Sequence, residues 1–347
     1  MGRRGSEPAQ PGARVALGSI DRRATVGRLS RGIVVVGLLA VAVLALVVAW
    51  GDAPAVLGAL SRFPPLLVVP VVLLTAWNYA LRWLRWNYYL RVLGISGIDR
   101  SSSALVFLSG FAMGLTPGKS GELTKSYWLR EIAGPERAPL ARTAPIVFAE
   151  RLVDGIAMLL LATSGLITFR FGGAALLVVA ALAAAAVALI QARPLVHWAL
   201  RALEARPRVR RAAGLIETAY DSARELLTWR RLVLAVGVGV LSWGGECVAL
   251  YVILLGLGAP PSVELLNQST FALAAGSLVG SASLLPGGIG AAEGTVAAVL
   301  DLVARQPRDV AAAATLLIRV CTLWFGVALG AAALVVLARR LVAANPR

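Results

Sequence analysis

Long apolar runs dominate the chain, and their lengths predict membrane-spanning helices. Long apolar runs cover residues 33–50, 174–190 and 232–257. Each is close to or longer than the roughly 20 residues that a helix needs to cross about 30 Å of hydrocarbon. Applying the same criterion to stretches with a few polar positions predicts six full spans, at 32–50, 64–90, 143–168, 173–191, 231–257 and 310–338. The pattern therefore predicts an all-α polytopic membrane protein.

Two further apolar segments, 101–131 and 264–303, are broken near the middle and do not read as simple spans. The first carries Thr-Pro-Gly-Lys-Ser-Gly-Glu at 116–122, and the second carries Leu-Pro-Gly-Gly-Ile-Gly at 285–290. An apolar arm, a Pro-Gly break and a second arm indicate a re-entrant helical hairpin. Irregular backbone inside a membrane persists only where protein or a wet cavity satisfies its polar groups.

The two broken segments belong to an internal repeat. Pro117, Gly118 and Gly121 recur 169 positions later at Pro286, Gly287 and Gly290. Arg151 recurs 168 positions later at Arg319, and each turn is followed by a carboxylate, Glu122 or Glu293. The first half, 32–170, has an odd number of crossings, so the second half, 173–338, enters the membrane upside down. Transporters with such inverted-topology repeats bind substrate where broken helices meet near the midplane.

Composition and charge support a membrane protein with a basic cytoplasmic side. The chain is 58% hydrophobic and 15% charged, with a net charge of +16. An ordinary soluble domain has about 25% charged residues, so a soluble enzyme is excluded. On the predicted topology 28 of the 34 Lys and Arg residues lie on one side and four on the other. This positive-inside distribution places both termini in the cytoplasm and argues against nucleic-acid binding, which needs one basic face.

The same topology divides the chain into a membrane domain and basic cytoplasmic segments. Residues 1–31 form a basic tail that we expect to be disordered, followed by a signal anchor that is too long to be a cleaved signal peptide. Residues 32–338 form the membrane domain. Its connector 193–231 is rich in arginine and predicts amphipathic helices on the anionic inner leaflet. The stretch 82–142 is counted on the same cytoplasmic side. A short tail, 339–347, ends the chain.

Charged residues deep inside the third, fifth and sixth predicted spans each cost about 2.5–3.5 kcal/mol on insertion scales. They are Glu150, Arg151, Asp154, Glu246 and Arg319. One interpretation is structural: Arg151 pairs with Asp154, and Arg319 with Glu293 or Glu246, to hold helices together. The other is that the repeated arginines bind an anionic headgroup, because guanidinium groups match phosphate.

The second interpretation defines a candidate substrate site around the two turns. Lys119 and Lys125 are the only lysines in the chain and both flank the first turn, so Lys119 is included as a phosphate contact. The two cysteines and single histidine lack metal-ligand spacing, and we expect no metal and no cofactor. The candidate substrate-binding residues are Pro117, Gly118, Lys119, Glu122, Glu150, Arg151, Asp154, Pro286, Gly287, Glu293 and Arg319.

Four motifs, in this order, resemble the flippase-like transmembrane family that includes the membrane domain of lysylphosphatidylglycerol synthase. They are Gly-Leu-Thr-Pro-Gly-Lys-Ser-Gly-Glu at 114–122, Phe-Ala-Glu-Arg-Leu-Val-Asp at 148–154, Leu-Pro-Gly-Gly-Ile-Gly-Ala-Ala-Glu at 285–293 and Leu-Ile-Arg-Val at 317–320. The resemblance covers about 32–338. It implies a lipid-flipping protein of the bacterial envelope, an aminoacyl-phospholipid or polyprenyl-phosphate-linked substrate, and site roles for Glu150, Arg151, Glu293 and Arg319. The chain ends nine residues after the last predicted span, so we expect no aminoacyl-transfer domain and no lipid synthesis.

These observations favour a transporter of anionic lipid in the bacterial cytoplasmic membrane, whose partners are the lipid headgroup and the surrounding membrane lipids. The alternative is a non-transporting scaffold for an envelope glycosyltransferase. An intramembrane hydrolase or glycosyltransferase is a third hypothesis, but the predicted spans contain no histidine and no paired-aspartate metal signature. We therefore expect that the chain is not an enzyme.

Overall fold

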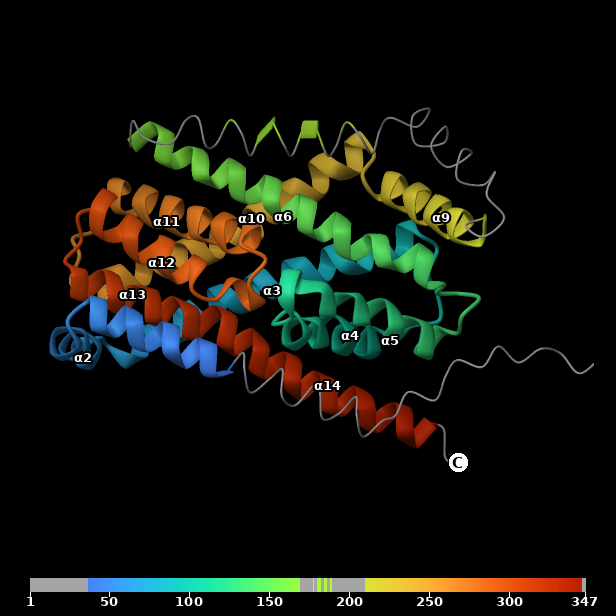
Figure 1. Cartoon of the computed structure of the whole chain (residues 1–347), viewed down its shortest axis with the longest axis horizontal. Coiled ribbons are helices and arrows are strands. Elements are labelled where there is room, and N and C mark those ends of the chain that lie inside the picture. The colour runs from blue at the N-terminus through green and yellow to red at the C-terminus, as the bar shows by residue number, and fades with distance from the viewer. Residues whose placement is uncertain are drawn as a thin grey trace, which may run out of the picture. The chain divides into compact units, whose positions relative to one another are not determined.

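Helices make up the described part of the chain. The computed structural model describes residues 37–168 and 210–344, with six scattered positions between 177 and 188. Every element in these ranges is a helix or a helical turn (Figure 1). The predicted tail at 1–31, most of the predicted span 173–191 and positions 193–209 of the connector lie outside the described residues. The all-helical prediction is confirmed for the ranges that the structure covers.

The first span is followed by a helix that the sequence pattern did not predict. The helix Gly37–Trp50 is bent by 96° from α2, Ala53–Arg62. Asp52 between them has a φ of 65°, a left-handed value that ends the first helix, and Pro54 begins the next because its fixed φ suits a first helical turn. A second short helix thus lies between the predicted spans 32–50 and 64–90, where the sequence analysis predicted no element.

Three continuous helices are long and apolar enough to cross a membrane. They are Pro65–Val92, which joins a short 3-10 turn to α3, Val68–Val92; α10, Trp229–Gly256; and Arg308–Leu341. They correspond to the predicted spans 64–90, 231–257 and 310–338. The third comprises α13 at Arg308–Arg319, a π-helical turn η5 at Val320–Trp324, and α14 at Phe325–Ala344. The predicted span 143–168 covers all but the first three residues of α6, Leu140–Thr168.

Both broken segments form helical hairpins around their Pro-Gly turns. The first comprises α4 at Arg100–Met113, the 3-10 turn η2 at Pro117–Leu123, and α5 at Thr124–Ala133. The second comprises α11 at Val263–Ala282, η3 at Pro286–Gly288, and α12 at Ala291–Ala298, which continues into a π-helical turn at Val299–Val303. In each hairpin the two helices pack against each other. Gly276 and Gly280 of α11 allow a close approach to α12, since a Cβ on either would lie within 3.0 Å of Val296 or Ala292.

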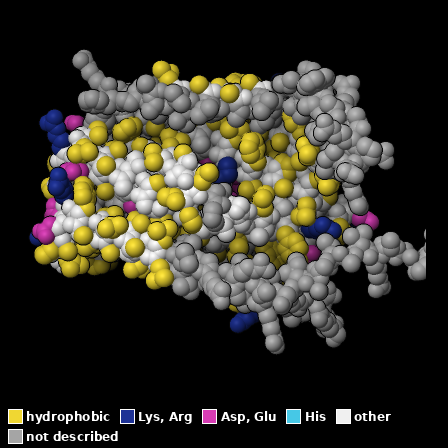
Figure 2. All heavy atoms as spheres, viewed as in Figure 1, with side chains coloured by type: hydrophobic (Ala, Val, Ile, Leu, Met, Phe, Trp, Pro, Cys, Tyr) yellow, Lys and Arg dark blue, Asp and Glu magenta, His cyan; other side chains and the backbone are white. Residues whose placement is uncertain are grey.

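Packing of the long helices places the two hairpins next to α3 and α6. Helix α14 packs along α4, α10 packs along α3, and α6 contacts α11 and α9, Arg210–Leu226 (Figure 1). One apolar core gathers around Trp86, Tyr89 and Phe107, and another around Leu250 and Leu254. Hydrophobic side chains dominate the middle of the described surface in Figure 2, while most charged ones lie towards its ends, as a membrane-embedded surface requires.

Asp99 caps the N-terminus of α4, and its removal is expected to destabilise the protein modestly. Its carboxylate accepts hydrogen bonds from the Ser101 hydroxyl at 2.5 Å and the Ser102 amide at 3.0 Å. These bonds hold the pKa of Asp99 below its usual range. We expect Asp99→Ala to lower the free energy of unfolding by about 1 kcal/mol at pH 7. A lowered pKa stabilises the fold above the unfolded value of about 3.9, and this contribution is lost as the pH falls.

Thermal unfolding in detergent at pH 7 and pH 3 measures this effect. Ser262→Ala is the matched control, because the Ser262 hydroxyl caps α11 by accepting from the Leu265 amide at 3.0 Å and does not titrate. The Asp99→Ala difference should shrink at pH 3, whereas the Ser262→Ala difference should stay constant. Equal differences at both pH values would contradict the assignment.

Candidate functional site

The two Pro-Gly turns, 169 positions apart in the sequence, meet in the folded protein. Turn η2 contacts turn η3, and a Cβ placed on Gly287 would lie 3.0 Å from the Leu115 side chain. Gly287, Gly288 and Gly290 all have positive φ values, between 61° and 92°, which L-residues with side chains rarely adopt. The glycines therefore allow a turn that is tight enough to bring the two hairpin tips into contact.

Each turn is tied to a long helix by an arginine–carboxylate pair. Arg151 of α6 donates through Nε, at 3.2 Å, and through Nη2 to the two carboxylate oxygens of Glu122. Arg319 at the end of α13 donates through Nε to Glu293 at 2.6 Å and through Nη2 to the Gly287 carbonyl at 3.2 Å. The turn, carboxylate and arginine that recur in the sequence thus form the same contact in each half, an arginine of a long helix bound to a carboxylate beside the turn.

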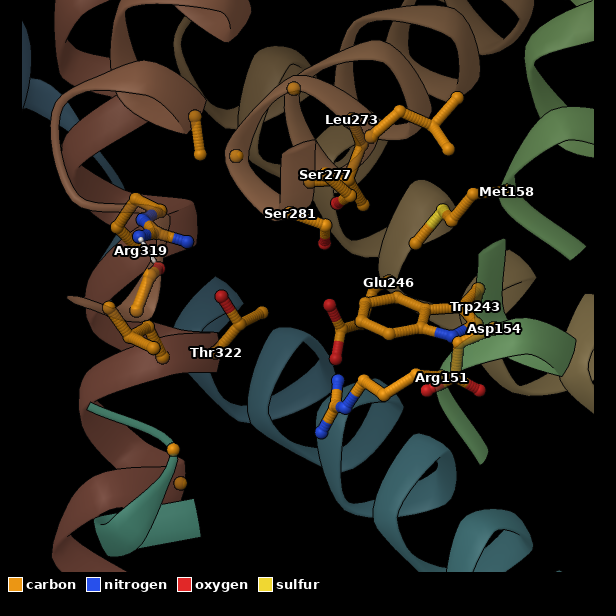
Figure 3. Close-up of a pocket in the computed structure, with 18 of the residues that line it drawn as sticks. Arg151, Asp154, Met158, Trp243, Glu246, Leu273, Ser277, Ser281, Arg319 and Thr322 are labelled. Carbon is orange, nitrogen blue, oxygen red and sulfur yellow. Dashed lines mark hydrogen bonds between the residues drawn. The ribbon is translucent and has the colours of Figure 1, made fainter. Parts of the chain in front are cut away.

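Both arginines line one cavity of about 370 Å³. The side chain of Arg151 is 30% exposed and that of Arg319 is 14% exposed, so neither pair is sealed from the cavity. Figure 3 shows Arg319 and Thr322 on one side of this cavity, with Arg151 and Glu246 on another. Further lining residues include Tyr79, Arg82, Phe111, Gly114, Glu122, Asp154, Trp243, Ser277, Ser281, Leu284, Leu285 and Gly287.

The predicted pairing of Arg151 with Asp154 is wrong. Asp154 instead accepts a hydrogen bond from Arg85 of α3 at 2.5 Å and forms an ion pair with Arg82 at 3.4 Å. Arg151 turns to Glu122 on the hairpin, because neighbouring helices offer both charges a partner with better geometry than the i, i+3 contact. For Arg319, the structure selects Glu293 from the two predicted partners.

The other candidate residues fall into three places. Glu122 and Gly287 line the cavity with the arginines. Glu293 lies behind Arg319 and also accepts from the Gly290 amide at 2.7 Å. Glu150 is not among the cavity-lining residues, and its carboxylate pairs with Lys125 at 2.6 Å. Pro286 belongs to η3. Pro117, Gly118 and Lys119 belong to η2, and the structure does not describe the side chains of these three residues.

Sequence reasoning missed the basic residues of α3. Both lie near the end of the predicted span 64–90 and were counted with the cytoplasmic stretch 82–142, but α3 buries the side chains of Arg82 and Arg85. The guanidinium of Arg82 also lies 5.5 Å from the Phe111 ring centre and 5.4 Å from that of Trp243, which stabilises a charge in a low-dielectric site. The spacing of Tyr79, Arg82 and Arg85 along one side of a helix is the signal that could have identified them.

The site is polar and charged without a recognisable metal centre. Within residues 37–168 and 210–344 no group of three or more His, Cys, Asp or Glu side chains is arranged to hold a metal ion. Cys247 and Cys321 are buried as free thiols. The chemistry that this arrangement offers is therefore recognition of an anion by oriented guanidinium groups, flanked by carboxylates and aromatic rings.

Comparison with known proteins identifies two similarities. The model of the family described as "Lysylphosphatidylglycerol synthase TM region" matches residues 34–330. A "UPF0104 membrane protein" of Methanothermobacter thermautotrophicus is 26% identical over 326 residues, which cover 87% of this chain and 94% of that relative. The family match includes both Pro-Gly turns and both repeated arginines.

Proposed function

From the fact that this chain belongs to the lysylphosphatidylglycerol synthase TM region family and is a membrane protein, we propose that it is a flippase-like transporter. Its cargo is an anionic lipid, or a lipid linked to polyprenyl phosphate, that moves between the two leaflets. The single observation that carries this proposal is that Arg151 and Arg319, one from each half of the chain, face the same cavity beside two contacting Pro-Gly turns.

Each of the two guanidinium groups keeps one nitrogen, Nη1, outside its contacts with the hairpin. Each uses Nε and Nη2 for its partners on the hairpin, and among the described residues no partner engages either Nη1. Arginine presents planar donors that match phosphate oxygens, and a charge-assisted hydrogen bond is about twice as strong as a neutral one. A phosphate group bound in the cavity at either Nη1 would leave the ion pair of that arginine unbroken.

The same proposal extends to topology. Six spans and two re-entrant hairpins, arranged as an inverted repeat, would let the tips enter from opposite sides and meet near the midplane, where such transporters bind substrate. Rocking of one half against the other would then expose the cavity to each leaflet in turn. The basic segments outside the spans support a plasma-membrane protein with both termini in the cytoplasm. In this scheme the cavity binds and releases, and it performs no covalent chemistry.

Substitution of the two arginines tests the proposal in reconstituted vesicles. We expect Arg151→Ala and Arg319→Ala each to slow the movement of fluorescently labelled phosphatidylglycerol at least 10-fold, because a hydrogen bond to a charged group contributes about 1.5–3 kcal/mol. Labelled phosphatidylcholine measures selectivity. Arg308→Ala is the matched control, since Arg308 pairs with Asp301, has a side chain that is 66% exposed and lies outside the cavity lining.

A paired substitution separates binding from packing. Arg319→Met combined with Glu293→Met replaces the ion pair with apolar side chains of similar length, which buried sites often tolerate. If the pair serves only to hold helices, this double variant should fold and transport normally; if Arg319 binds the headgroup, it should fold but not transport. A wild-type protein that moves no lipid but purifies in a stable complex with an envelope glycosyltransferase would favour the scaffold function instead.

A further inference from the structure

A second group of buried charges lies next to the cavity and takes no part in headgroup binding. Lys125 of α5 donates to Glu150 of α6 at 2.6 Å, and the two side chains are 4% and 1% exposed. The Lys125 ammonium also lies 4.9 Å from the Trp86 ring centre and 5.7 Å from that of Phe107. A titratable pair buried this deeply, outside the cavity lining, requires a reason beyond contact with substrate.

The polar atoms around this pair are incompletely satisfied by the protein. Glu150 Oε1, Arg85 Nε and Nη1, and the Tyr89 hydroxyl are all buried and have no hydrogen-bond partner within the described ranges. Arg85, Tyr89 and Glu150 also act on one another electrostatically. Native proteins rarely leave such groups unmet, and internal water usually bridges them when the site is polar. Water linking these three side chains would therefore make one hydrogen-bonded cluster.

This cluster reaches the headgroup cavity through Asp154. The Asp154 carboxylate lines the cavity and accepts from Arg85 Nη2 at 2.5 Å. Asp154 and Arg85 thus connect the cavity to the group of unpartnered polar atoms on Arg85, Tyr89 and Glu150, and water between those atoms would complete a hydrogen-bonded route. Its inner end is a carboxylate held by a single lysine, next in sequence to Arg151.

We propose that Glu150 is a proton-binding site that couples proton movement to lipid movement, an inference that rests on the proposed function. A proton carried by water adds to the Glu150 carboxylate, so that an O–H bond forms and the ion pair with Lys125 is lost. Lys125 keeps its charge and remains against the Trp86 and Phe107 rings, which stabilise a cation. The proton leaves by the reverse step after the cavity has opened to the other side.

Electrostatics couples this proton to the headgroup. The charged and titratable groups that act on Glu150 are Lys125 of α5, Arg85 and Tyr89 of α3, and Arg151 of its own helix. Neutralising Glu150 removes a negative charge beside Arg151, so an anionic headgroup binds more tightly when the proton is bound, and the reverse follows by linkage. A proton and an anion moving together also transfer no net charge against the membrane potential.

The test measures net and exchange movement separately in vesicles that contain the purified full chain and a pH-sensitive dye. Labelled phosphatidylglycerol serves as the probe. In the wild type we expect an imposed pH gradient to accelerate net lipid movement, accompanied by a change in lumenal pH. Glu150→Gln still offers Lys125 an acceptor but does not titrate. In the Glu150→Gln variant, the gradient-driven rate of lipid movement and the change in dye signal should both fall at least 10-fold. The rate of lipid exchange at equal pH on both sides should stay within about threefold of the wild-type rate.

Two further variants make the outcome decisive. Glu131→Gln removes an exposed carboxylate from α5 and should change neither rate. Tyr89→Phe removes one hydroxyl from the cluster and should reduce gradient-driven movement at least threefold, which provides a result even if Glu150→Gln does not fold. Wild-type lipid movement that ignores the pH gradient, or full coupling in Glu150→Gln, would overturn this inference and leave the transporter intact. A wild type that moves no lipid would overturn both.

Discussion

Replacing Asp154 with alanine should lower the free energy of unfolding by about 3–5 kcal/mol, the effect of breaking a buried ion pair from one side. Asp154 is 5% exposed and compensates the charges of Arg82 and Arg85. Without it, two guanidinium groups in a low-dielectric interior lose the carboxylate that pairs with both of them. Because Asp154 joins α6 to α3, its loss should also separate the two helices that carry half of the cavity's charged residues.

Thermal and denaturant unfolding in detergent micelles measures this effect. Asp301→Ala is the matched control, because Asp301 pairs with Arg308, whose side chain is 66% exposed, at 3.4 Å. Pairs in such exposed positions contribute about 0–1 kcal/mol. A similar loss of unfolding free energy in both variants would contradict this prediction, because it would show that the buried ion pair between α3 and α6 contributes no more to stability than an exposed one.

Replacing Gly288 with alanine should disrupt the second hairpin tip and abolish transport. Gly288 has a φ of 66°, and a Cβ there would lie 3.0 Å from backbone atoms of Gly280 on α11. The left-handed conformation costs a residue with a side chain about 1–2 kcal/mol, and overpacking against backbone adds about 1–3 kcal/mol. The turn would have to move, displacing the Gly287 carbonyl that accepts from Arg319 and the contact with Leu115.

Gly294→Ala is the control for this substitution. Gly294 lies in α12 only six positions later, and a Cβ there meets no atom within 4 Å. Alanine in the middle of a helix should be neutral or stabilising by up to about 1 kcal/mol. Lipid transport in vesicles and thermal unfolding should therefore differ sharply between the two variants. Normal transport by Gly288→Ala would show that the tip geometry is not needed for function.

The structure also shows why some sequence predictions succeeded and others failed. Apolar length predicted α3, α10 and the helix that contains Arg319, because a bilayer requires about 20 apolar residues in any fold. Turn chemistry predicted both hairpins, since adjacent Pro and Gly residues mark a turn between two helical arms. The burial of Arg82 and Arg85 was missed because they look like charges of a cytoplasmic segment until Asp154, 69 residues after Arg85, is brought beside them.

The sequence alone therefore determined the elements and the chemistry of this protein: apolar helices, two Pro-Gly turns, and a repeated carboxylate and arginine in each half. These features depend on local backbone preference and on burial in hydrocarbon, which act over a few turns of chain. Only the tertiary structure decided the partners. It paired Arg151 with Glu122, Glu150 with Lys125 and Asp154 with α3, because the Coulomb energy of a buried charge depends on distances in space that residue spacing along the chain does not contain.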